Sequence, residues 1–287
     1  MPGTWLITGT TRGFGRELVT AALDHGDNVV ATARRPEQLD DIAREYGNRV
    51  RTTALDVTDA AAARAAVQVA VAEFGSLDVV VNNAGFAISA PIEEMADADF
   101  RSQLETNLFG VVNVTRAALP VLHRQRSGHI IQFSSIGGRV GGTPGMGGYQ
   151  TAKFAVEGFS EVLNAEVKPL GIKVTIIEPG GFRTDWGGSS MGTVPVGPDY
   201  DATVGQMNRY RESTVAAWAG DPKRAAQIIV ELPDLDDPPL RLLLGAGAVE
   251  SAASSSRARA EEAERWSAVS RSADFGADAV PVAPAAA

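Results

Sequence analysis

A glycine-rich turn between a buried strand and a helix is the feature that most restricts how this 287-residue chain can fold. The first strand is expected at Thr4–Thr8, and the residues that follow, GTTRGFGREL, place Gly9, Gly13 and Gly15 ahead of a helix. Glycines let the backbone turn tightly and approach an anion, which the free N–H groups and the dipole of the helix attract. The turn therefore predicts a pyrophosphate site, although a glycine turn needed only for packing is the alternative.

Short β-branched runs alternate with amphipathic helical segments along most of the chain. The nearly continuous apolar character of these runs is typical of parallel strands that are covered on both faces. This alternation predicts an α/β fold, a Rossmann-like doubly wound parallel sheet in a single domain. We expect strands at Thr4–Thr8, Asn28–Ala33, Val50–Leu55, Leu77–Val81, His129–Phe133, Lys173–Glu178 and Leu240–Leu244.

The C-terminal third is expected to contain a lid and a tail. The segment Gly187–Gly205 is rich in Gly, Ser and Pro, and so long a loop in a compact domain is usually functional. We therefore expect a domain at residues 1–250, with a substrate-binding lid at about 186–220. Residues 251–287 are expected to form a C-terminal helix and an Ala/Pro-rich tail.

Composition excludes several classes of function. The net charge of −9 argues against an extended nucleic-acid-binding face. The chain has no cysteine, and its three histidines form no ligand-spaced pair, so we expect no metal site. No apolar run approaches the ~20 residues of a membrane span, and a strand begins too early for a signal peptide. We expect a cytoplasmic protein without a membrane partner.

The end of the second expected strand carries two arginines. A site that binds NAD normally has Asp or Glu here, about 20 residues after the glycine turn, for the ribose 2′-hydroxyl. This chain has Ala33 and then Arg34, so no carboxylate repels a 2′-phosphate and a guanidinium is available to bind it. We interpret Arg35 as a solvated neighbour.

Several motifs in one order resemble the short-chain dehydrogenase/reductase family, in its compact single-domain form, over roughly residues 4–244. Besides the glycine turn they are LDV with Asp56, NNAG at 82–85, ETNLFG with Asn107, a serine pair, YQTAK at 149–153 and PGGFRT at 179–184. Within the family, EPGGFRTDW and PPLRLLLG look most like bacterial oxidoreductases of the 17β-hydroxysteroid-dehydrogenase-like subgroup.

The resemblance implies four catalytic residues. Tyr149 is expected to be the general acid/base, and Lys153, one helical turn away, to tune it and to hold the cofactor ribose. Ser135 is expected to orient the substrate oxygen, and Asn107 to hold a water of the proton relay. Ser134 is an open alternative to Ser135, because the glycine-rich loop before Tyr149 is one residue longer than is common in the family.

The same resemblance assigns a cofactor, NADP(H), and the residues that bind it. Arg12 is expected to join Arg34 at the 2′-phosphate. Asn82 is expected to lie near the cofactor or to tie neighbouring strands together. The expected cofactor-binding residues are Gly9, Thr11, Arg12, Gly13, Phe14, Gly15, Arg34, Asp56, Val57, Asn83, Ala84, Gly85, Tyr149, Lys153, Pro179, Gly180, Phe182 and Thr184.

For the substrate we expect a small-molecule carbonyl or alcohol in an apolar pocket formed by Phe86, Ser135, Met146 and Trp186, with Phe182 and Met191 as further candidates. This implies an NADP-dependent alcohol dehydrogenase or carbonyl reductase, and family habit implies a homodimer or homotetramer. A non-catalytic NADP(H)-binding sensor is the alternative from another class. A sugar epimerase or dehydratase is disfavoured by the glycine spacing and the lack of a second domain.

Overall fold

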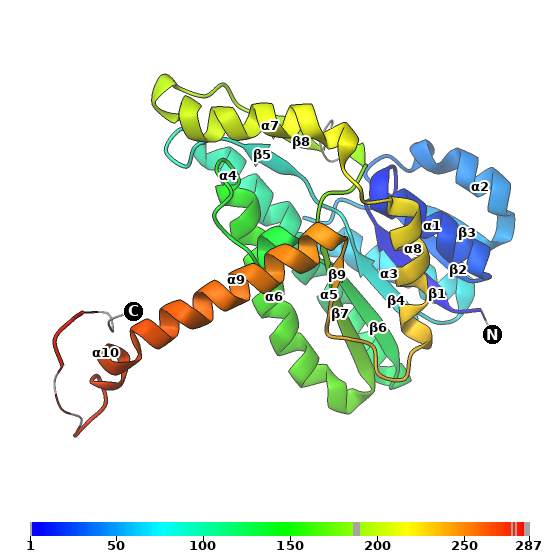
Figure 1. The fold of residues 1–287 in the computed structure, drawn as a ribbon. Coiled ribbons are helices and arrows are strands. Elements are labelled where there is room, and N and C mark those ends of the chain that lie inside the picture. Colours follow the sequence, from blue (N-terminus) through cyan, green and yellow to red (C-terminus); the bar gives the residue numbers. More distant parts are fainter. Residues whose placement is uncertain (1, 186–189, 277, 279, 284–287) are drawn as a thin grey trace.

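The central element of the computed structural model is a seven-stranded sheet in which all strands are parallel, with helices on both faces (Figure 1). The structure describes residues 2–185, 190–276, 278 and 280–283. The strands are β1 (Thr4–Thr8), β2 (Asn28–Ala33), β3 (Val50–Ala54), β4 (Val79–Asn82), β6 (Gly128–Phe133), β7 (Ile172–Pro179) and β9 (Arg241–Leu244). All seven lie within two residues of their expected bounds, so the prediction of a single Rossmann-like doubly wound sheet is confirmed.

Ten α-helices are described. They are α1 (Gly13–His25), α2 (Asp40–Tyr46), α3 (Ala60–Phe74), α4 (Asp97–Leu104), α5 (Gly110–Gln125), α6 (Gly147–Val167), α7 (Gln206–Thr214), α8 (Pro222–Val230), α9 (Ala246–Arg265) and α10 (Ser267–Arg271). Helix α3 shows how the sequence sets a boundary: the Asp59 carboxylate accepts hydrogen bonds from the N–H groups of Ala61 and Ala62, which have no partner inside the helix.

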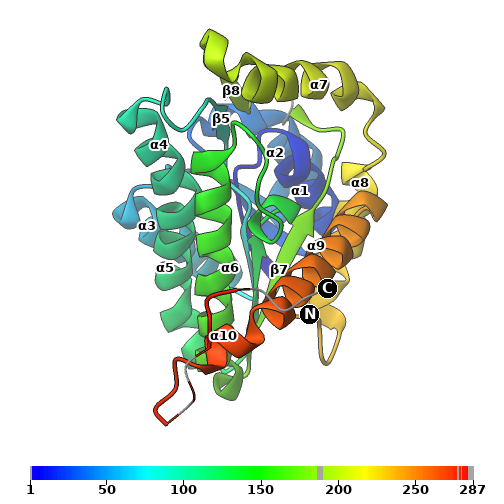
Figure 2. The ribbon, with the colours of Figure 1, turned by 60° about the vertical axis from the view of Figure 1, so that its left-hand side comes forward.

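Two apolar layers hold the helices to the sheet (Figure 2). On one face, side chains of α1, α2 and α8 pack against the strands around Trp5, Ile7 and Val29. On the other face, α3, α5 and α6 pack around Leu6 and Val80. Alternate residues of the same strand enter opposite layers, which explains why these strands read as continuous apolar runs.

The strand order β3-β2-β1-β4-β6-β7-β9 reverses its direction between β1 and β4. In open α/β sheets, ligands bind outside the carboxyl ends of the strands at such a reversal. The glycine turn follows β1 and the NNAG motif begins at the end of β4, so this point lies between two motifs of the sequence.

The segment expected to be a lid contains regular structure that the composition did not reveal. Strand β8 (Met191–Thr193) pairs in parallel with β5 (Ala87–Ser89), and α7 lies across this pair in both views (Figures 1 and 2). The expected boundary at residue 250 falls inside α9, whose Ala248 and Ala252 are buried on the domain. Further along α9, Arg259 donates to the Arg139 carbonyl and lies over the Phe154 ring, and the helix then leads to α10 (Figure 1).

Within the described residues, no helix is long and apolar enough to cross a membrane, and no cluster of His, Asp or Glu side chains could hold a metal ion.

A buried histidine in β6 makes stability depend on pH. His129 Nε2 lies 2.9 Å from the Thr175 hydroxyl, which itself donates to the Pro239 carbonyl, so Nε2 is the protonated nitrogen of a neutral ring. Burial, with a smaller effect of Lys173, lowers the pKa of His129 to about 4 from its ordinary 6.5.

The folded protein should therefore lose stability as the pH falls from about 6.5 toward 4, because the unfolded chain takes up the proton first. We expect the free energy of unfolding to drop by about 2 kcal/mol between pH 7 and pH 5 on account of this residue. Urea unfolding of the wild type and of His129→Gln, compared at each pH, measures the effect. Equal slopes for both proteins would contradict it.

Candidate active site

A cavity of about 960 Å³ lies at the carboxyl edge of the sheet, at the reversal between β1 and β4. Its walls include residues from every motif that the sequence singled out, brought together from positions as distant as Gly9 and Thr184. Of the expected site residues, the lining contains Gly9, Thr11, Arg12, Gly13, Phe14, Arg34, Asp56, Val57, Asn83, Ala84, Gly85, Phe86, Ser135, Tyr149, Lys153, Pro179, Gly180, Phe182 and Thr184.

The glycine turn is shaped for close approach. A Cβ on Gly9, whose φ is +69°, would lie 2.8 Å from Ala84 Cα, and a Cβ on Gly15 would lie 2.2 Å from the Gly9 carbonyl oxygen. Any larger residue at either position would displace the backbone of the turn. The turn leads directly into α1, whose N-terminal residues Gly13 and Phe14 line the cavity, so a pyrophosphate fits there as expected.

Basic and polar side chains line the part of the cavity beyond the end of β2. Arg12 and Arg34 both reach it, and so do Arg35 and Gln38, which we had not expected there. Asp56 accepts hydrogen bonds from the Thr58 hydroxyl and N–H, and these lower its pKa, with a smaller contribution from Arg34. Two or three guanidinium groups with no carboxylate at position 33 form a suitable site for a phosphate monoester.

The serine and tyrosine hydroxyls meet on one wall. Ser135 accepts a hydrogen bond from the Gly137 N–H at 3.0 Å, and its own hydroxyl bonds to Tyr149. Ser134 Oγ is buried and has no hydrogen-bond partner among the described residues. The geometry therefore favours Ser135 over Ser134 as the serine that shares a reacting atom with Tyr149.

Burial shifts the proton affinities of Tyr149 and Lys153 toward their neutral forms. Burial raises the pKa of Tyr149 to about 12, and the bond from Ser135 acts in the opposite direction. Burial lowers the pKa of Lys153 to about 8, and the Glu157 carboxylate opposes this. Lys153 Nζ donates to the Phe133 carbonyl at 2.7 Å and lies 5.7 Å from the centroid of the Tyr149 ring. The chain by itself thus does not lower the Tyr149 pKa, because desolvation outweighs the hydrogen bond from Ser135.

Asn107 lies in a single π-helical turn, Glu105–Phe109, between α4 and α5. Its Nδ2 donates to the Phe86 carbonyl at 2.8 Å, and its Oδ1 accepts from the Phe86 N–H at 3.0 Å. A Cβ on Gly85 would lie 2.6 Å from Asn107 Oδ1 and 3.8 Å from Lys153 Nζ, so Asn107 stands directly behind the cavity wall beside the lysine.

Several residues that the sequence assigned to the site do not line the cavity or lie outside the described residues. Asn82 ties strands together, since its Nδ2 donates to Gln132 and Thr115. Among the described residues, Met146 and Gly15 are not part of the lining: Met146 is buried with Ala87 and Tyr149, and Gly15 packs under the turn. Trp186 lies outside the described residues.

The lining of the cavity also includes residues that the sequence had not indicated. Trp218 lines it and packs so closely on Gly181 that a Cβ there would lie 3.1 Å from the indole ring. Ile88, Ser190 and Gly192 bring the small β5–β8 sheet into the wall. Trp218 is an isolated tryptophan in the segment between α7 and α8, and no local pattern in the sequence indicated its place.

Several known proteins are similar to this chain over most of its length. A family model described as short chain dehydrogenase matches residues 4–192. Oxidoreductase BOA17 of Botryotinia fuckeliana is 46% identical, over 93% of this chain and 97% of that protein. A short-chain dehydrogenase from Streptomyces avermitilis is 38% identical, with a TM-score of 0.89 over 96% of this chain and all of that one. An alcohol dehydrogenase from the archaeon Thermococcus sibiricus, solved with 5-hydroxy-NADP, is 26% identical, with a TM-score of 0.71 over 85% of this chain and 96% of that one.

The chain therefore belongs to the short-chain dehydrogenase family, and it is an oxidoreductase of that family.

Replacing Asn107 tests how the site is held. Asn107→Ala removes both partners of the half-buried Phe86 main chain, so the free energy of unfolding should fall by about 1–3 kcal/mol. Asn113→Ala is the control, because its amide donates to the Val57 and Thr58 carbonyls in the turn before α3 and leaves Phe86 untouched. Urea unfolding measures both variants, and an Asn107→Ala protein as stable as Asn113→Ala would contradict the expectation.

Proposed function

We propose that the protein is an NADP(H)-dependent oxidoreductase that interconverts a ketone or aldehyde with the corresponding alcohol. The observation that carries the proposal is the convergence of Ser135, Tyr149 and Lys153 on the cavity that also contains the glycine turn and Arg34. The bound nicotinamide cofactor supplies or accepts the hydride. The 5-hydroxy-NADP in the alcohol dehydrogenase of Thermococcus sibiricus supports the choice of cofactor.

Tyr149 acts as the acid toward the carbonyl oxygen. With a pKa of about 12 in the buried site, its hydroxyl keeps its proton near neutral pH, and a positive charge close to the ring is needed to make it a stronger acid. In the oxidation direction the Tyr149 phenolate must be stabilised. The Ser135 hydroxyl and the nearby Lys153 ammonium would provide this stabilisation. The same hydroxyl pair orients the substrate oxygen between them.

The Ser135 hydroxyl is oriented to donate a hydrogen bond to the reacting oxygen. Because the Gly137 N–H already bonds to its Oγ, the hydroxyl hydrogen is directed away from the loop and toward the reacting oxygen. Lys153 uses one of its three protons on the Phe133 carbonyl, which leaves two for the cofactor ribose. Asn107 is proposed to extend the proton relay, since its amide keeps one proton and one lone pair beyond the two bonds to Phe86.

Arginine side chains are proposed to bind the adenosine end of the cofactor. Arg12 and Arg34 would bind the 2′-phosphate, and Arg35, which also reaches the cavity, becomes a third candidate. The substrate would be a bulky carbonyl compound or alcohol held against Phe86 and Trp218. The homodimer or homotetramer expected from family habit stays a prediction.

Replacing the tyrosine tests the enzymatic proposal. Tyr149→Phe should lower kcat for NADPH-dependent reduction by about 10²–10⁴-fold, the usual contribution of a general acid. NADPH affinity and the melting temperature should stay close to those of the wild type. Tyr210→Phe, an exposed position on α7, is the matched control and should keep full activity. Wild-type protein that binds NADPH but reduces no member of a broad carbonyl panel would instead support the sensor alternative.

Replacing the residues at the end of β2 tests the cofactor. The double variant Ala33→Asp, Arg34→Leu should shift the ratio of NADPH to NADH affinity toward NADH by about tenfold or more, since a charge-assisted hydrogen bond contributes ~1.5–3 kcal/mol. Arg44→Leu, on the exposed face of α2, is the control. Titration of each cofactor by fluorescence gives the ratio, and Arg35→Leu separates the second arginine from the first. An unchanged ratio in the double variant would exclude the assignment of Arg34.

A further inference from the structure

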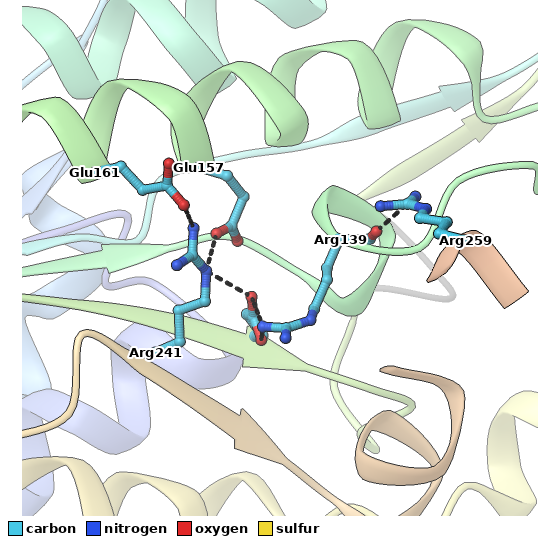
Figure 3. A network of polar contacts seen from close by, with 6 residues as sticks. Arg139, Glu157, Glu161, Arg241 and Arg259 are labelled. Atoms are coloured by element: carbon cyan, nitrogen blue, oxygen red, sulfur yellow. Dashed lines mark hydrogen bonds and ion pairs between the residues drawn. The ribbon is translucent and has the colours of Figure 1, made fainter. Parts of the chain in front are cut away.

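A network of arginine and glutamate side chains lies behind the helix that carries Tyr149 and Lys153 (Figure 3). Its centre is Arg241 of β9, whose Nε lies 3.0 Å from Glu157 Oε2 and 3.5 Å from Glu178 Oε1. Arg241 also forms an ion pair with Glu161, one turn further along α6. Arg139 Nη1 lies 3.4 Å from both oxygens of Glu178.

The network joins three walls of the cavity. Glu178 immediately precedes Pro179 and Gly180, which line the cavity at the end of β7. Glu157 follows Lys153 by one turn on α6, and Arg139 follows the short helical turn that begins after Ser135. One group of charges thus connects the serine loop, the catalytic helix and the end of β7.

Glu157 and Glu161 both bond to Arg241, but their surroundings differ. The Glu157 side chain is 9% exposed, and its Oε1 has no hydrogen-bond partner among the described residues. The Glu161 side chain is 55% exposed. Water screens the charge of Glu161, whereas the field of Glu157 acts on its buried neighbours with little screening.

Lys153 is the buried cation on the same face of α6, four residues before Glu157. The other groups around it are Tyr149 on its own helix and the Phe133 carbonyl of β6. On the far side of Glu157 lie the network members Glu178, Arg139 and Arg241. Because burial lowers the pKa of Lys153 to about 8, its charge near neutral pH is easily lost, and the Glu157 carboxylate opposes that loss.

We propose that Glu157 is a positioning residue for the reaction: its buried carboxylate, clamped by Arg241, keeps the Lys153 ammonium charged and in place beside Tyr149. The inference rests on the proposed function, in which a charged Lys153 holds the cofactor and assists Tyr149. If Glu157 served only to stabilise the fold, removing its charge would change NADPH affinity and rate by the same factor at every pH.

Glu157→Gln tests the proposal, since it removes the charge and keeps the shape and an oxygen for Arg241. With the opposing charge gone, Lys153 should lose its proton at lower pH. NADPH affinity and kcat/KM should then fall by about threefold or more, relative to the wild type, as the pH rises from 7 to about 9. At pH 6, where Lys153 is charged in both proteins, the variant should approach wild-type values. Glu161→Gln, the matched control on the same helix, should follow the wild-type profile, and Glu157→Asp should restore it in part.

The outcomes separate the two proposals. Wild-type protein that binds NADPH but turns over no carbonyl contradicts the proposed function, while the pH dependence of NADPH affinity still decides the role of Glu157. A folded Glu157→Gln protein whose affinity and rate follow the wild-type pH profile overturns the inference. If that variant does not fold, Glu157→Met of similar volume replaces it, and failure of both to fold overturns the inference as well, since Glu157 would then be a structural residue only.

Discussion

The Thr8 hydroxyl joins the carboxyl ends of β1 and β4 by hydrogen bonds. It accepts hydrogen bonds from the Asn83 and Ala84 N–H groups, both at 3.0 Å, and donates to the Val81 carbonyl at 3.2 Å. These bonds join the carboxyl ends of β1 and β4 where the strand order reverses. The chain after β1 must then pass so close to Ala84 that only glycine fits at position 9. The position of the glycine turn, and with it the N-terminus of α1, follows from this junction.

Near that junction, neighbouring polar and charged groups partly offset the effect of burial on the pKa values of Tyr149 and Lys153. Tyr149 and Lys153 are both buried, which shifts each toward its neutral form. Two groups oppose these pKa shifts. The Ser135 hydroxyl reaches Tyr149 from the loop after β6, and the Glu157 carboxylate acts on Lys153 from the same helix, α6. The protonation states of Tyr149 and Lys153 thus depend on the balance between desolvation and a few polar or charged neighbours.

Much of the candidate site could be predicted, because each short motif depends on the backbone conformation of a single strand end or helix face. The glycine turn, NNAG and the Tyr149–Lys153 pair each belong to one strand end or one helix face, and all line or border the same cavity. Residues that reach the cavity over longer paths could not be predicted. Trp218 enters from a segment after α7, and β5 pairs with β8 across a hundred residues of chain, so their place depends on packing that no local pattern encodes. Arg35 is exposed, as expected, but it also lines the cavity, because alternation along a strand end does not reveal how the following turn is directed.

By itself the sequence determined the sheet, its parallel strands, the turn that suits a pyrophosphate and the residue types that line the candidate active site. Apolar periodicity and glycine placement are local properties, which explains this success. Only the tertiary structure showed that Ser135 bonds to Tyr149, packed Met146 against Tyr149, and joined α6 through Glu157 and Arg241 to the end of β7. Those outcomes depend on which side chains meet across distant elements and how far each is removed from water, and both quantities arise only when the layers pack.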